Sequence, residues 1–300
     1  MHKEQDGAAA DRPRGGAPAA DGTPTLGQVL LAIEELWPAS LAEDWDAVGL
    51  VAGRPGSPVR RIVFAVDPTV EVVRDAVSRG ADLLITHHPL LLRPVHGVAA
   101  TSAKGEAVHS LIEGGCALVT THTNADSAVG GVSDVLADIL GLTDVEPLAP
   151  SGAGLPEEGI GRIGLLPHSQ TLGDFAARVF GALPAVAGGV RVAGDPAGLV
   201  RRVAVCGGAG DSLLGVVRNA GADVYVTADL RHHPASEARE ASEEGRPYLV
   251  DVSHFASEWL WLPAAAEALR NVLRDHDFDV EIAVSGINTD PWDFVLTPGP

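Results

Sequence analysis

Short apolar runs rich in β-branched residues alternate with segments of helical periodicity along most of this 300-residue chain. Strands that are regularly separated by helices form βα units and pair mainly in parallel, so the alternation predicts an α/β fold. The predicted strands are Arg61–Val66, Asp82–Thr86, Ala117–Thr121, Arg162–Leu166, Val203–Cys206, Asp223–Thr227, Tyr248–Val252 and Asp279–Val284. The predicted helices are Leu26–Trp37, Val70–Arg79, Lys104–Glu113, Ser133–Leu140, Leu172–Phe180, Ser212–Asn219, Ala235–Glu244 and Glu258–Asp275.

A weak internal repeat indicates two similar lobes. Residues 61–89 and 202–234 both contain an apolar run, a helical pattern, a Gly-Ala-Asp turn, a second apolar run and a His-His-Pro sequence. The second copy has four inserted residues before its histidines. We therefore predict two α/β lobes over 25–150 and 151–300, joined by a Gly/Pro-rich linker at Pro147–Gly161, with a site in the cleft between them. One interlocked domain over 25–295 is the alternative.

The first 24 residues are rich in Ala, Gly, Pro and Asp and show no apolar periodicity. Such a segment cannot bury enough surface to offset the entropy lost on ordering it. We predict a disordered tail over 1–24, followed by a helix for which Thr25 is a suitable N-cap.

The formal net charge is −19, with 21 Lys and Arg against 40 Asp and Glu. Nucleic-acid binding requires a basic face, so no such partner is expected. No apolar run approaches the roughly 18 residues of a membrane span, and no signal-peptide pattern is present, which predicts a cytoplasmic protein without a membrane partner. Cys116 and Cys206 are too few for a disulfide framework and are expected to pack as small hydrophobic residues.

Residue types that bind metal ions follow several predicted strands. His87 and His88 end one strand, where a proline fixes the exit and the two imidazoles can diverge toward two ions. Asp126 follows another strand, and His254 and Glu258 are four residues apart, on one face of a helix. Ligands collect at the carboxyl ends of strands in open α/β sheets. These five residues therefore predict a site for two divalent ions, either zinc, iron or manganese.

Each cluster also has a structural explanation. A His-His-Pro sequence often forms a turn, and a His-x-x-x-Glu pair often lies on a solvated helix face. Three clusters at separate strand ends favour the metal site. His122 also follows a strand. His232 and His233 could equally bind substrate or cap a helix. Asp67 could support a metal ligand or cap a helix.

The run Cys206–Asp211 places three glycines between a predicted strand and helix. Backbone amides at such a helix start can hold an anion. A tight turn that needs glycine dihedral angles explains the run equally well, and the full dinucleotide fingerprint is missing.

Several motifs together resemble one family. They are Ala42–Leu50, Ile85–Leu90, His122–Asp126, Val205–Gly210, Thr227–Asp229, His254-x-x-x-Glu258 and Asp290-Pro291. From Thr25 to about Val295, the chain resembles the Nif-three-like dinuclear metal-centre family, whose members are often described as GTP cyclohydrolase I type 2 and form ring-shaped hexamers. The resemblance implies that the metal ligands are His87, His88, Asp126, His254 and Glu258, with Glu258 bridging both ions.

Two positions depart from the family pattern. Ala47 stands where asparagine is usual, and Ala228 where glycine is usual. Neither is a ligand position, so the departures bear on substrate contacts or turn geometry. The large middle insertion of longer members is also missing.

A two-ion site predicts hydrolysis, because bound water becomes hydroxide near neutral pH while the second ion polarises the bond under attack. The attacked atom would be C8 of a purine in a cyclohydrolase, or phosphorus in a phosphoesterase. We expect Glu258 to be catalytic, a small-molecule substrate such as a nucleotide, and a symmetric homohexamer. A non-catalytic metal-binding scaffold or regulator would use the same ligands, and a nucleotide-binding module centred on Gly207–Gly210 is a third hypothesis.

Overall fold

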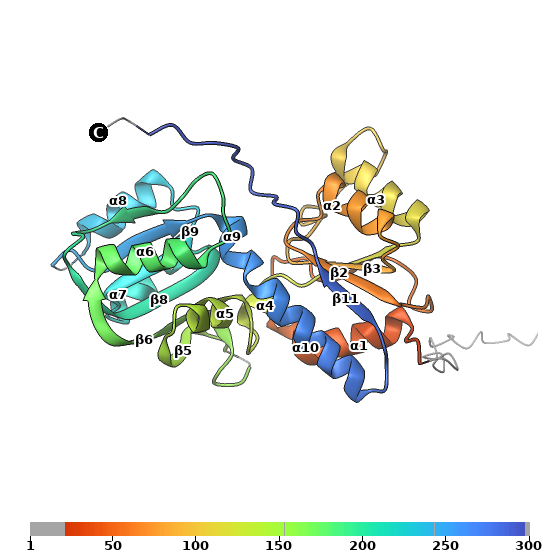
Figure 1. Ribbon diagram of the computed structural model, residues 1–300, viewed down its shortest axis with the longest axis horizontal. Helices are drawn as coiled ribbons and strands as arrows, with labels where there is room; N and C mark the ends of the chain where they lie inside the picture. The colour runs from red at the N-terminus through yellow and green to blue at the C-terminus, as the bar shows by residue number, and fades with distance from the viewer. Residues whose placement is uncertain (1–21, 153, 243, 298–300) are drawn as a thin grey trace, which may run out of the picture.

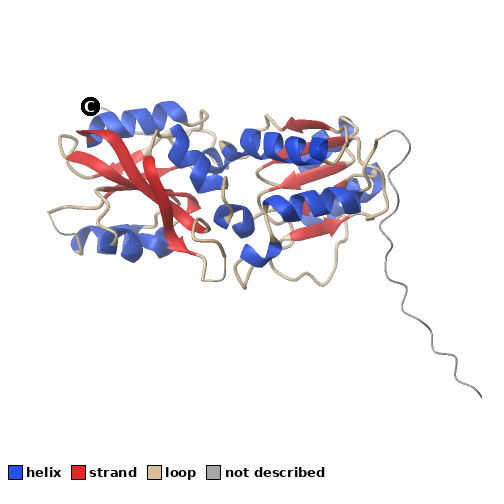
Figure 2. Ribbon diagram, turned by 90° about the horizontal axis from the view of Figure 1, so that it is seen from below, coloured by secondary structure: helices blue, strands red, loops and turns tan. Residues whose placement is uncertain are grey.

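The computed structural model describes residues 22–152, 154–242 and 244–297. It contains two lobes side by side, each built on one β-sheet with helices on both faces (Figures 1 and 2). The predicted α/β fold is confirmed. Residues 1–21 of the predicted tail lie outside the described residues. At the end of that segment Thr23 is buried, and the Val59 amide donates to the Pro24 carbonyl at 2.9 Å.

The first lobe has a five-stranded sheet in the order β1-β4-β3-β2-β11, in which every pair is parallel except β1 with β4. Its strands are β1 (Gly49–Ala52), β2 (Arg61–Ala65), β3 (Leu83–Thr86), β4 (Ala117–Thr120) and β11 (Glu281–Val284). Its helices are α1 (Leu26–Leu36) and α10 (Trp261–Asp275) on one face and α2 (Val70–Ser78) and α3 (Ala103–Gly114) on the other. The all-buried runs of β3 and β4 match a sheet covered on both faces.

The second lobe has a six-stranded sheet in the order β5-β6-β8-β9-β10-β7, parallel only across β8, β9 and β10. Its strands are β5 (Thr143–Pro150), β6 (Gly159–Thr171), β7 (Arg191–Ala193), β8 (Leu199–Ala209), β9 (Val224–Ala228) and β10 (Tyr248–Val252). Helices α5 (Val132–Ile139) and α6 (Leu172–Ala182) pack on one face, and α7 (Leu214–Asn219) and α8 (His232–Glu240) on the other. The 3₁₀ turn η2 (Asp211–Leu213) precedes α7.

The two lobes interlock, because the chain enters the second lobe and then returns to the first. Helix α10 packs beside α1, and β11 pairs with β2 at the edge of the first sheet. The short helices α4 (Thr123–Ser127) and α9 (His254–Trp259) lie where the chain passes between lobes (Figure 1), and η1 (Ala39–Leu41) contacts α4. The sheets therefore do not follow the linear division at residue 150 that the sequence predicted.

The predicted linker Pro147–Gly161 is instead the hairpin between β5 and β6, with Pro147 paired to Arg162 and Pro150 to Gly159. Its prolines suggested a linker, but β5 is an edge strand, where proline is tolerated. Among the described residues, no helix combines the length and apolarity needed to cross a bilayer.

The predicted repeat has a structural counterpart in one side-chain contact. In the first lobe, Asp82 accepts hydrogen bonds from the amides of Arg60 and Arg61 at 2.7 and 2.9 Å. In the second lobe, Asp223 accepts from the amides of Arg201 and Arg202 at 2.8 Å each. Asp82 and Asp223 are therefore equivalent in the two lobes, and each links the start of its own strand to the neighbouring parallel strand.

Candidate metal centre

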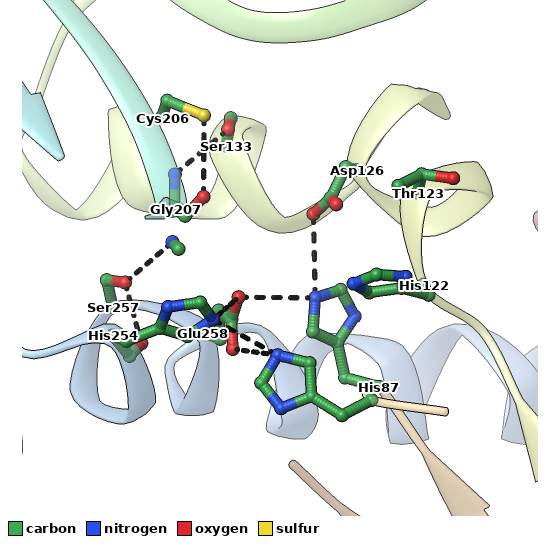
Figure 3. Close-up of polar contacts among 12 residues, drawn as sticks. His87, His122, Thr123, Asp126, Ser133, Cys206, Gly207, His254, Ser257 and Glu258 are labelled. Carbon is green, nitrogen blue, oxygen red and sulfur yellow. Dashed lines mark hydrogen bonds and ion pairs between the residues drawn. The ribbon is translucent and has the colours of Figure 1, made fainter. Parts of the chain in front are cut away.

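Six side chains of ligand type converge in one cluster where the chain passes between the lobes, and Figure 3 labels all of them except His88. They come from three places in the fold: the end of β3, the short helix α4 and the short helix α9. The side chains are His87, His88, His122, Asp126, His254 and Glu258. The structure thus brings together the five residues singled out in the sequence, and it adds His122.

Local sequence explains how α9 presents its two side chains. Ser253 is the N-cap, and its hydroxyl accepts a hydrogen bond from the Ala256 amide at 3.2 Å. The helix that it starts places His254 and Glu258 one turn apart, and their Nε2 and Oε1 atoms are 2.9 Å apart. The predicted helix 258–275 is divided here, because α9 ends at Trp259 and α10 begins at Trp261.

Glu258 lies at the centre of the cluster and is almost fully buried. Its Oε1 is 3.4 Å from Nε2 of His87, and its Oε2 is 3.1 Å from Nε2 of His88. Asp126 approaches the same Nε2 atom of His87, with its Oδ1 at 3.7 Å. Glu258 therefore lies between the imidazoles at the end of β3 and the imidazole of α9, a position from which one carboxylate can serve two ions.

Each imidazole is fixed through its Nδ1 atom by an oxygen acceptor. The acceptors are the Thr121 carbonyl at 2.9 Å for His87, Asp67 at 2.7 Å for His88, Asp229 at 2.8 Å for His254 and Asp46 at 2.8 Å for His122. When Nδ1–H donates outward, Nε2 keeps its lone pair toward the centre. This arrangement of carboxylate or carbonyl behind histidine is typical of metal ligands. Asp67 therefore supports a candidate ligand, and the N-cap of α2 is Thr69.

Two polar atoms of the cluster support the fit to cations. Nε2 of His87 and Oε2 of Glu258 are buried without a hydrogen-bond partner, an arrangement that costs free energy unless an ion or water satisfies it. The nitrogens of His87, His88 and His122 lie within 4.8 Å of one another, and so do ligand atoms of His88, His254 and Glu258. The residues present therefore fit divalent metal ions, and a mixed imidazole and carboxylate set suits zinc, iron or manganese.

The electrostatics of the cluster are dominated by Glu258. Burial disfavours its charged form, but His88, His254 and His87 outweigh burial and hold the pKa of the Glu258 carboxyl well below its usual range. Burial also disfavours protonation of His88, and Glu258 and Asp67 outweigh it, so the pKa of His88 lies well above its usual value. Cations are thus strongly favoured beside this carboxylate, whether they are protons or metal ions.

The glycine run ends β8 and leads into η2, because β8 stops at Ala209 and Asp211 begins the 3₁₀ turn, and its first glycines pack against the centre. The Gly207 amide donates to Ser133 Oγ at 3.3 Å, and the Gly208 amide donates to Ser257 Oγ at 2.9 Å (Figure 3). These two amides are therefore engaged by the protein itself. Gly208 also has a φ of +65°, so the structural explanation of the run is favoured over anion binding.

His232 and His233 lie outside the centre. They begin α8 and are exposed to solvent. The residue of that segment that reaches the centre is Asp229, which accepts a hydrogen bond from His254.

The two positions that depart from the family pattern, Ala47 and Ala228, each lie next to a carboxylate that accepts a hydrogen bond from a histidine of the cluster. Ala47 follows Asp46 and donates its amide to it at 2.7 Å, and Ala228 precedes Asp229 and is fully buried.

The centre opens onto a cavity of about 660 Å³, which both His88 and His254 line. Cys116 and Cys206 are buried free thiols, and burial raises the pKa of each to about 12. They pack as the sequence predicted.

Comparison with known sequences gives matches over nearly the whole chain. The family described as Duf34/NIF3 (NGG1p interacting factor 3) matches residues 24–291. A Streptomyces coelicolor protein named GTP cyclohydrolase 1 type 2 homolog is 51% identical over 271 residues, covering 90% of this chain and 94% of that protein. A Mycobacterium tuberculosis protein of the same name is 38% identical over 373 residues, covering 89% and 96%.

Solved structures have the same fold. A Bacillus cereus protein related to NIF3 superposes with a TM-score of 0.83 at 27% identity, covering 91% of this chain and 99% of that chain. Reduced HcgD from Methanocaldococcus jannaschii gives a TM-score of 0.71 at 26% identity, covering 88% and 99%. These similarities confirm the family resemblance that the motifs indicated.

Proposed function

Since this chain belongs to the Duf34/NIF3 family, we propose that it is a metal-dependent hydrolase that acts on a nucleotide or phosphoester through two divalent ions. The observation that carries the proposal is the convergence of His87, His88, Asp126 and His254 on the buried carboxylate of Glu258. The names of the bacterial relatives favour a GTP cyclohydrolase-like activity.

In this proposal the protein supplies binding and orientation. His87, His88, Asp126 and His254 would hold the two ions, and Glu258, whose two oxygens face His87 and His88, would be the ligand that they share. Asp67 and Asp229 keep two of the imidazoles in the tautomer that presents Nε2. Ions bound in this way supply a nucleophile at neutral pH and a Lewis acid.

The test begins with elemental analysis of protein purified without chelator, which should approach two divalent ions per chain. Loaded protein is then assayed against GTP and a panel of phosphoesters, alongside Glu258→Gln. Turnover that disappears in a folded Glu258→Gln variant supports the hydrolase. A protein that binds two ions and turns over none of the panel would instead be a metal-binding scaffold or regulator.

We infer further that the chain forms a symmetric homo-oligomer, and the family resemblance supports a hexamer. Closed rings avoid open-ended association. Light scattering should give a mass about six times that of one chain, and a monomer mass across the micromolar range would contradict the inference.

A further inference from the structure

The cavity beside the metal centre has walls from both lobes and from the C-terminal segment. We call residues 285–297 the C-terminal strap, which leaves β11 in the first lobe and runs toward the second (Figure 1). Six strap residues line the cavity: Thr289, Asp290, Pro291, Trp292, Phe294 and Val295. The strap therefore faces the same space as the candidate ligands His88 and His254.

The strap is anchored on both sides of the centre. Thr289 donates its hydroxyl to Asp67 at 2.5 Å, and Asp67 is the carboxylate that holds His88. The Ser253 hydroxyl, at the N-cap of α9, donates to Asp290. The first strap residues are thus tied to the supports of two candidate ligands, one from each lobe.

Beyond these anchors the strap presents large aromatic side chains that the protein leaves uncovered. Trp292 is 70% exposed and Phe294 is 76% exposed, although both line the cavity. Aromatic rings gain substantially from burial against another ring, and exposed apolar surface in a cavity typically marks a ligand site.

The carboxylates that line the cavity already have partners within the protein. Asp67 and Asp229 accept from histidines, Asp290 accepts from Ser253, and Asp251 pairs with Arg191. The exposed aromatic faces of the strap are available for a ligand.

We propose that the C-terminal strap is the substrate-contacting wall of this cavity, with Trp292 stacking on a planar ring of the substrate whose reacting group reaches the metal centre. This inference rests on the proposed function, because it assigns the cavity beside the centre to that substrate. Trp292 then determines specificity for ring-bearing substrates over phosphate chains without a ring.

The test compares two probes on the full manganese-loaded protein by calorimetry. GTP carries a ring and a triphosphate, whereas inorganic tripolyphosphate carries the phosphates alone. The wild-type protein should bind GTP more tightly than tripolyphosphate. Trp292→Ala should weaken GTP binding between about fivefold and about a hundredfold, the range of base stacking on an aromatic side chain, and leave tripolyphosphate binding and metal content unchanged. Trp292→Phe should retain most of the preference.

Phe180→Ala is the matched control, since Phe180 is 61% exposed on α6 and lies outside the cavity lining. Equal affinity of both probes for the wild-type protein, or an unchanged preference in Trp292→Ala, overturns the strap proposal. The proposal is also overturned if Trp292→Ala still prefers GTP to tripolyphosphate but forms a smaller assembly by light scattering. Trp292 would then be a subunit contact. Binding with the expected preference but without turnover counts against the hydrolase alone, and binding of neither probe overturns both.

Discussion

The carboxylate of Glu258 occupies the space that any side chain at position 208 would need. A Cβ atom added to Gly208 would lie 2.3 Å from Glu258 Oε1, well inside contact distance. Gly208 belongs to β8 and Glu258 to α9, so the second sheet directly limits where the central carboxylate can lie.

Gly208→Ala should therefore displace Glu258 and reduce metal binding. The left-handed backbone adds strain of about 1–2 kcal/mol for any non-glycine residue. Metal content and thermal unfolding measure the two effects. Gly215→Ala is the control, because a Cβ atom there has nothing within 4 Å. Full metal occupancy in Gly208→Ala would show that the carboxylate does not need its present position.

Glu258→Gln should lose metal more completely than His88→Ala. Removing one imidazole weakens mainly one ion, whereas removing a bridging charge loosens both and leaves their repulsion less compensated. Ion counting after titration with zinc or manganese distinguishes the variants. Glu267→Gln, an exposed change on α10, should bind as the wild-type protein does. Two tightly bound ions in Glu258→Gln would disprove the bridging role.

Asp67→Asn should weaken metal binding by about 10- to 100-fold, the usual cost of losing a carboxylate behind a ligating histidine. The amide no longer favours the tautomer in which His88 presents Nε2 to the centre. Competition with a chelator measures the affinity. Asp75→Asn, which removes an ion pair with Arg79 on the surface of α2, serves as the control. Equal affinities for both variants would mean that Asp67 has no part in metal binding.

The metal-free protein should lose stability as the pH rises from about 7 to about 10. Burial lowers the pKa of His254, but Glu258 and Asp229 outweigh burial and raise it to about 10. Because folding raises the pKa of His254, its protonation stabilises the folded state fully at pH values below the unfolded pKa near 6.5. This stabilisation is lost as the pH rises through the folded pKa. Thermal unfolding of chelator-treated protein across this range measures the slope. The stability of metal-loaded protein should depend less on pH, since a ligating imidazole carries no proton on the nitrogen that binds the metal. A stability of the metal-free protein that does not change with pH would contradict the raised pKa of His254.

The sequence predicted the buried strands and the edge strand β11, and it missed the edge strands β1, β5 and β7. Runs such as Leu83–Thr86 are almost entirely apolar and are buried throughout, and the end of this run pointed to His87 and His88 as candidate ligands. Strands β1, β5 and β7 are short, exposed or interrupted by proline, so local composition carries little signal for them. The return of β11 to the first sheet depends on pairing with β2, more than 200 residues away, which no local pattern specifies.

The same limit applies to the candidate centre. Motif spacing identified the residues that converge, but not the oxygens behind them, because Asp46, Asp229 and the Thr121 carbonyl come from other elements. The His-His-Pro repeat directed attention to His232 and His233, whereas the four inserted residues move them onto α8. Only the neighbouring Asp229, at the end of β9, keeps a place beside the centre.

The return of the last strand to the first sheet also sets an order of assembly during synthesis. While the ribosome is still making the second lobe, His87, His88 and Asp126 are present, but β2 has an open edge that only residues 281–284 close. His254 and Glu258 emerge shortly before that strand. A nascent chain therefore acquires the complete ligand set and the edge that seals its first sheet almost together, after the second sheet has been made, and any chain terminated before α9 lacks both.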